Sequence, residues 1–159
     1  MGRCYRIFLI AQLIGFGTLA TAQQSIPEED ISMTVLKWFY DHYPNAENAI
    51  WKQHETNNNM YKVAFSFEKQ QYEATYDKKG KRRSDLVYLD IAPIDLTNFL
   101  YEQFDQFKYR KVAKKTIYPT GDVSYITTVK SKKEGIQELV LEENTISFTL
   151  VSQVAVSDQ

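Results

Sequence analysis

The stretch "MYKVAFSFEKQQYEATYDKKGK", residues 60–81, decides the fold, because apolar and polar side chains alternate along it in two successive runs. The apolar residues share one parity within each run: Tyr61, Val63, Phe65 and Phe67 in the first, and Tyr72, Ala74 and Tyr76 in the second. Successive side chains of a β-strand point to opposite faces of a sheet. The stretch therefore predicts two strands, each with one face toward a core and one toward water.

A helix is predicted just before this pair of strands. Its apolar positions recur every four residues, at Ile31, Val35, Phe39 and Tyr43. Asp30 is a suitable residue to cap its start, and Pro44 stops it. Strands are expected at 49–55, 60–68, 71–77 and 82–90.

The same order of elements is predicted a second time. Residues 91–107 carry a helical stripe of Leu96, Leu100, Phe104 and Phe107, and strand-like runs follow at 109–119, 122–130, 136–142 and 145–154. The apolar stripe of this second helix lies about 65 positions after that of the first helix, as expected for corresponding segments of a repeated unit. We therefore predict an α+β fold of two tandem helix-plus-antiparallel-meander repeats, 31–90 and 91–154, with helices on one face of a curved antiparallel sheet. The alternative is chance likeness between two helix-plus-meander segments.

Residues 1–22 have the features of a signal peptide. Arg3 and Arg6 precede an apolar run from Ile7 to Leu19, and Ala20-Thr21-Ala22 is a small-x-small cleavage pattern. We expect export to the periplasm or medium, a mature domain of 23–159, and no membrane insertion after the signal is removed. A retained anchor is disfavoured, because the apolar run is shorter than the roughly 20 residues that span a bilayer.

Charge and cysteine content exclude several classes of function. The only cysteine, Cys4, lies in the predicted leader, so the mature chain would have no disulfide, reactive thiolate or cysteine-bound zinc. Without the leader 17 basic and 20 acidic residues remain, which does not favour a nucleic-acid partner. The basic run "KKGKRR", residues 78–83, is interpreted as a solvated hairpin tip, with a phosphate-binding patch as the alternative.

No motif predicts catalysis. His42 and His54 lack a third ligand at a recognisable spacing, so we expect no metal, and no other cofactor is indicated. Motifs of serine hydrolases, zinc proteases and phosphate-binding loops do not occur. Neighbouring acids such as Glu142 and Glu143 give no sign of a catalytic cleft. We therefore predict that the protein is not an enzyme.

Together, these motifs resemble the PepSY-like, beta-lactamase-inhibitor-like family of secreted bacterial proteins. The matching positions are Val35, Phe39, Tyr43, Pro44, Ala46, Trp51, Tyr61, Val63, Phe65, Tyr76, Asp77 and Gly80. Ser32 and Thr97 stand where the family often has proline, and Glu68–Gln71 replaces its usual Asp-Gly turn. The resemblance implies helices packed on an antiparallel sheet and a binding or inhibitory role. It supplies no catalytic residues.

The face of the sheet away from the helices is the candidate binding surface, with another protein as the expected partner. Strand parity and the second run of strands place six residues on it: Lys62, Ser66, Glu73, Thr75, Ile126 and Thr128. The resemblance implies that a concave sheet of this kind grips the target. Two alternatives stay open: a small structural or ligand-binding envelope module, and a cystatin-like or NTF2-like enzyme, which would need a pocket with a buried acid or histidine.

Overall fold

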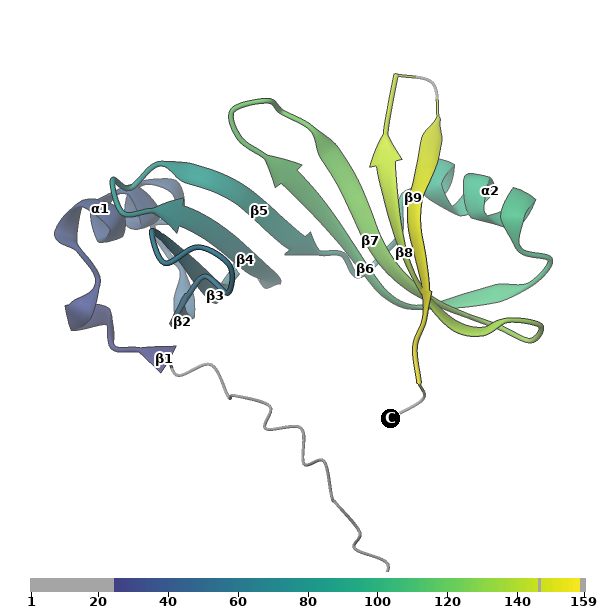
Figure 1. The fold of residues 1–159 in the computed structure, drawn as a ribbon, viewed down its shortest axis with the longest axis horizontal. Helices are drawn as coiled ribbons and strands as arrows, with labels where there is room; N and C mark the ends of the chain where they lie inside the picture. The colour runs from purple at the N-terminus through teal and green to yellow at the C-terminus, as the bar shows by residue number, and fades with distance from the viewer. Residues whose placement is uncertain (1–24, 146, 158–159) are drawn as a thin grey trace, which may run out of the picture.

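The computed structural model describes residues 25–145 and 147–157 of the chain, and within them it forms one antiparallel sheet of nine strands in chain order (Figure 1). The strands are β1 (Ser25–Ile26), β2 (Glu47–Gln53), β3 (Met60–Phe67), β4 (Gln70–Asp77), β5 (Arg82–Tyr88), β6 (Phe107–Ile117), β7 (Val123–Ser131), β8 (Gly135–Glu143) and β9 (Phe148–Ala155). A short 3-10 turn, η1 (Glu28–Asp30), and two helices, α1 (Met33–His42) and α2 (Ile94–Gln103), complete the described elements.

The fold class predicted from the sequence is wrong. We expected an α+β protein of two tandem repeats, whereas the structure is mostly a single nine-stranded sheet with two short helices, and a repeat is not shown. β5 pairs with β6 along Ser84–Tyr88 and Ala113–Ile117, which joins the two expected units into one sheet. The predicted boundary near residue 91 is therefore a connection within a continuous sheet.

The hairpin predicted at residues 60–81 is confirmed by β3 and β4. Tyr61 pairs with Tyr76 and Phe67 with Gln70, so only Glu68 and Lys69 form the turn. Both have positive φ, 49° and 67°. Two-residue hairpin loops require such angles because their twist must match that of the strands. The turn is therefore tight although neither position is a glycine.

α1 covers the core of the β1–β5 half of the sheet. The four apolar positions of the predicted stripe are buried, and Val35 and Phe39 are wholly inaccessible. They pack with Trp51, Val63, Phe65 and Tyr76. The predicted cap is wrong: Asp30 lies in η1, and Ser32 caps α1 by accepting a hydrogen bond from the Val35 N–H at 3.3 Å.

α2 covers a second core on the β6–β9 half of the sheet. Leu96 and Leu100 are buried against Val129, Leu139 and Leu141. Phe104 and Phe107, the last positions of the predicted stripe, lie beyond the helix, at its carboxyl end and in β6. The two helices lie toward opposite ends of the sheet (Figure 1).

Strand register shows that both helices cover the same face. Ala74 of the first core pairs with Asp85 on β5, and Val87, two residues further on, pairs with Lys114. Lys114 pairs in turn with Tyr125, a member of the second core. Paired residues, and residues two apart in a strand, share a face. The opposite face, called the open face below, is therefore covered by neither helix.

The predicted signal peptide, residues 1–22, lies outside the described residues and stays a prediction. In the described part of the chain, no helix is long and apolar enough to cross a membrane.

Candidate functional site

The open face carries a shallow depression at its centre, called the central hollow. It has a volume of about 240 Å³. Its lining residues are His54, Glu55, Thr56, Lys62, Glu73, Thr75, Ser84, Leu86, Lys115 and Ile126. They come from the β2–β3 loop and from five consecutive strands, β3 to β7. The hollow therefore spans the junction between the two cores.

Four of the six predicted site residues meet in this hollow: Lys62, Glu73, Thr75 and Ile126. Lys62 pairs with Thr75 across the β3–β4 ladder, and Ile126 lies on β7 opposite Ala113. The remaining two are elsewhere. Ser66 accepts a hydrogen bond from the Gln71 side chain at 2.8 Å near the hairpin turn, and Thr128 pairs with Lys111.

Glu73 is the centre of a charged cluster on the open face. Its carboxylate forms an ion pair with Lys62 and accepts a hydrogen bond from the Tyr88 hydroxyl. The ammonium group of Lys111 lies 4.5 Å from the centre of the Tyr88 ring, in cation–π contact. We name Lys62, Glu73, Tyr88 and Lys111 the Glu73 cluster. It links β3, β4, β5 and β6 across the face.

The cluster shifts two pKa values. Burial acts to raise the pKa of Glu73, but hydrogen bonds from Lys62 and Tyr88 outweigh it, and the pKa is lowered from its ordinary value. Burial, together with the hydrogen bond to Glu73, raises the pKa of Tyr88. At neutral pH the cluster is therefore a carboxylate held by an ammonium group and a protonated phenol.

We expect the Glu73 cluster to make stability depend on pH. Because the pKa of Glu73 is lower in the folded state, its contribution is present above about pH 4.3 and is lost as the pH falls through the folded pKa. The free energy of unfolding of the wild type should exceed that of Glu73→Gln by up to about 1 kcal/mol at neutral pH, since the pair is partly exposed. Urea unfolding from about pH 7 to about pH 3 measures the difference. A difference that grows on acidification would contradict the prediction.

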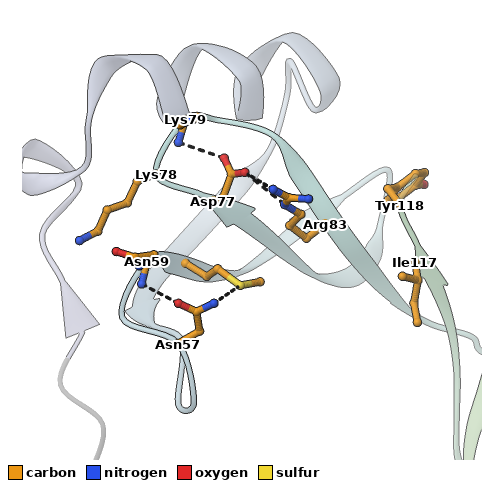
Figure 2. Close-up of a pocket in the computed structure, with 9 residues that line it drawn as sticks. Asn57, Asn59, Asp77, Lys78, Lys79, Arg83, Ile117 and Tyr118 are labelled. Atoms are coloured by element: carbon orange, nitrogen blue, oxygen red, sulfur yellow. Dashed lines mark hydrogen bonds and ion pairs between the residues drawn. The ribbon is translucent and has the colours of Figure 1, made fainter. Parts of the chain in front are cut away.

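A second depression, the turn-end hollow, lies at the ends of the strands, between the β2–β3, β4–β5 and β6–β7 turns (Figure 2). It has a volume of about 650 Å³, and its lining residues are Asn57, Asn59, Met60, Asp77, Lys78, Lys79, Arg83, Ile117 and Tyr118. In Figure 2 Asp77 points toward Arg83, and the two form an ion pair at 2.6 Å. The second Asp77 oxygen accepts the backbone N–H groups of Lys79 and Lys81. Both carboxylate oxygens of Asp77, the most buried charged group in this hollow, therefore already have partners.

The predicted hairpin tip at residues 78–83 adjoins this hollow and is built on Gly80. Gly80 has a φ of +81°, and a Cβ atom there would lie 2.4 Å from the Trp38 ring and 2.9 Å from the Thr34 carbonyl oxygen. Only glycine fits this approach of the tip to α1. Arg82 and Arg83 do not extend freely into solvent, because each pairs with an aspartate.

Sequence reasoning missed Tyr88, Lys111, Leu86 and the loop residues 54–56. Leu86 and Tyr88 have the parity of the open face, but Val87 between them is also apolar, so alternation did not show which face they occupy. In β6 a bulge between Tyr109 and Lys111 changes the parity in mid-strand. Within the described residues, no group of three or more potential metal ligands comes together.

Solved structures of similar shape exist, although no family model and no curated protein sequence matches the chain. A BLIP-like protein from Bacteroides fragilis superposes with a TM-score of 0.62 and 16% identity, over 84% of this chain and 90% of that one. This chain has a BLIP-like fold. A DUF2874 family protein from Bacteroides ovatus (TM-score 0.57, 15% identity) covers 75% of this chain and 86% of its own. A candidate periplasmic protein from Bacteroides eggerthii (TM-score 0.61, 14% identity) covers 77% and 87%.

Proposed function

We propose that this protein is an exported, non-enzymatic binding protein that engages another protein through its open face and acts as an inhibitor. The observation that carries the proposal is the uncovered face itself, which runs across the whole sheet and has the Glu73 cluster at its centre. The apolar side chains of Leu86 and Ile126 lie beside these charges in the central hollow. Apolar contacts with a few ordered polar groups are typical of protein interfaces.

The BLIP-like fold and the leader sequence support this proposal. The Bacteroides fragilis structure is described as BLIP-like, and the Bacteroides eggerthii structure as a candidate periplasmic protein. The pattern of residues 1–22 agrees with export to the periplasm or medium. The aromatic-Asp-x-x-Gly turn, formed by Tyr76, Asp77 and Gly80, supports the narrower assignment to the PepSY-like proteins.

The geometry of the central hollow and of the turn-end hollow favours a protein partner over a small molecule. The central hollow is below the roughly 300–1,000 Å³ of typical small-ligand pockets. The turn-end hollow is large enough, but its aspartate is already engaged, and none of its lining residues is a histidine. An enzyme of cystatin-like or NTF2-like architecture would need a buried acid or histidine aimed into such a space.

The test is whether the captured partner is lost when the charges of the Lys62–Glu73 ion pair are exchanged. Lys62→Glu combined with Glu73→Lys exchanges the two charges, so the ion pair is kept while its direction is reversed. We expect the double variant to fold with a free energy of unfolding within about 1 kcal/mol of the wild type, because only the hydrogen bond from the Tyr88 hydroxyl is lost, but to lose most of the partner captured from the native periplasm or medium. Each single variant should both lose partner and be less stable, because it places two like charges together.

A matched control lies on the other side of the molecule. Lys37 and Asp41 form an exposed ion pair on α1, and Lys37→Glu with Asp41→Lys inverts it in the same way. This variant should retain the partner. Equal capture by both charge-exchanged variants would contradict binding at the open face. The binding site would then lie on the turns or the helices.

A further inference from the structure

The two edges of the sheet differ in how they are protected from pairing with another strand. At one edge β1 has only two residues, Pro27 follows it, and the adjoining strand β2 carries Glu47 and Lys52. Short edge strands, proline and charged side chains are the usual ways in which proteins prevent edge-to-edge association. This edge is therefore closed to a further strand.

β9, at the other edge, lacks charge and proline. Its eight residues, Phe148–Ala155, read FTLVSQVA and include no charged residue, proline or glycine. Val151, Val154 and the following Val156 are 54%, 56% and 42% exposed. A bulge between Val140 and Leu141 of the ladder displaces β9 near Val151, but beyond it Ser152, Gln153, Val154 and Ala155 pair regularly with β8. An exposed, uncharged and regular segment of this kind favours pairing with another strand.

The backbone of this segment has hydrogen-bonding groups directed outward. The Val156 N–H donates to the Ile136 carbonyl on β8 at 2.9 Å. Since successive residues of an antiparallel strand direct their N–H and C=O groups to opposite sides, the backbone N–H and C=O of Val154 also point toward β8. The backbone N–H and C=O groups of Gln153 and Ala155 then point away from the sheet. β9 has no further strand beside it in the described part of the chain.

We propose that two copies of this chain pair through β9, antiparallel about a two-fold axis at Val154. Gln153 of each copy then lies opposite Ala155 of the other, and each such pair exchanges two backbone hydrogen bonds. The two Val154 side chains form the non-hydrogen-bonded pair between them, where side chains approach most closely. A second copy fits this edge better than a charged partner strand, because β9 offers no charge to complement and an isologous interface needs only one self-complementary segment.

The symmetry of this dimer has a functional consequence. A two-fold axis that relates paired antiparallel strands is perpendicular to the sheet, so side chains of the same parity lie on the same side in both copies. The two open faces would therefore look in one direction. A dimer of this kind presents two binding faces side by side and gains avidity toward a partner that is itself oligomeric or membrane-arrayed.

Cysteine cross-linking tests both the dimer and its register. In the full chain with Cys4→Ser no native thiol remains, because Cys4 is the only cysteine. Val154→Cys should form a disulfide dimer readily under mild oxidation, since non-hydrogen-bonded pairs have Cα atoms about 4.5 Å apart, within disulfide range. Gln153→Cys is the matched control. Its copies are diagonal neighbours, roughly 7–8 Å apart, and should cross-link at least tenfold more slowly.

Sedimentation across a protein concentration series gives an independent reading. The wild type should shift from monomer to dimer, and Ala155→Pro should stay monomeric while keeping its thermal unfolding transition, because it removes an N–H that does not bond β8. A wild type that is monomeric throughout, equal cross-linking at both cysteine positions, or an unchanged dimer in Ala155→Pro would each overturn the proposal.

Discussion

Replacing Phe65 with alanine should lower the free energy of unfolding by about 3–5 kcal/mol, the range expected when a fully buried phenylalanine is truncated. Phe65 is 2% exposed. Its ring centre lies 4.9 Å from that of Phe39 and 4.6 Å from that of Tyr43, and it stacks on Tyr72 at 5.5 Å. The variant loses both the burial of the ring and its aromatic contacts, since one helix and two strands meet around it.

Ser66→Ala is the matched control for this prediction. Ser66 is the next residue of β3 and lies on the open face, where its hydroxyl accepts one exposed hydrogen bond from Gln71. Its loss should cost less than about 1 kcal/mol. Chemical denaturation of both variants measures the contrast. Similar, small losses would show that Phe65 does not hold α1 against the sheet.

The sequence predicts the two faces of β3 and β4 because strand alternation is a local property. Tyr61, Val63, Phe65 and Phe67 lie on the face toward α1, as their shared parity requires. The stripe on α1 is equally local, since it depends only on the 3.6-residue period of one helix. These features could be predicted because no distant residue is needed to define them.

The continuous sheet could not be predicted in the same way. The pairing of Ser84 with Ile117 joins residues that are far apart in the chain, with α2 between them. The alternation of a strand predicts that it belongs to a sheet but not which strand lies beside it. Two separate meanders and one long sheet therefore have similar sequences. The expectation of tandem repeats came from the similar spacing of the two helical stripes, which says nothing about how the strands that follow them pair.

The candidate site was predicted only where parity was unambiguous. Lys62, Glu73, Thr75 and Ile126 were placed by alternation, and the structure brings them to one hollow. Tyr88 and Lys111 complete the cluster from β5 and β6, where apolar residues occur at both parities or a bulge intervenes. The chemistry of the site thus depends on strand pairings that the sequence alone does not specify.

A buried carboxylate on the helix side of the sheet joins elements that lie far apart in the chain. The Asp85 carboxylate, on a residue 6% exposed, accepts hydrogen bonds from the Tyr43 hydroxyl at 2.7 Å and from Arg82 at 3.0 Å. Tyr118, from the β6–β7 turn, donates to the same oxygen at 3.4 Å. Burial, followed by the hydrogen bond to Asp85, raises the pKa of Tyr43, so its hydroxyl stays protonated and donates. Asp85 therefore links the end of α1 to β5 and to the β6–β7 turn.

We expect Asp85→Ala to lower the free energy of unfolding by about 3 kcal/mol. Removing one partner of a buried ion pair typically costs about 3–5 kcal/mol, because the other charge is left uncompensated. The lower end applies here for two reasons. The Arg82 side chain keeps 23% of its surface exposed, and the second Asp85 oxygen is buried without a hydrogen-bond partner in the described part of the chain, which already weakens the wild type.

A double-mutant cycle with Tyr43→Phe separates this hydrogen-bonded network from simple loss of packing. Tyr43→Phe alone should cost about 1–2 kcal/mol, since it leaves the buried carboxylate without its shortest bond. In Tyr43→Phe/Asp85→Ala both partners are gone, so the combined loss should fall short of the sum by at least about 0.5 kcal/mol. Urea unfolding at neutral pH measures all four proteins. Strict additivity would mean that Asp85 acts only through packing in the core of the β1–β5 half, because independent packing losses add whereas a shared hydrogen bond can be lost only once.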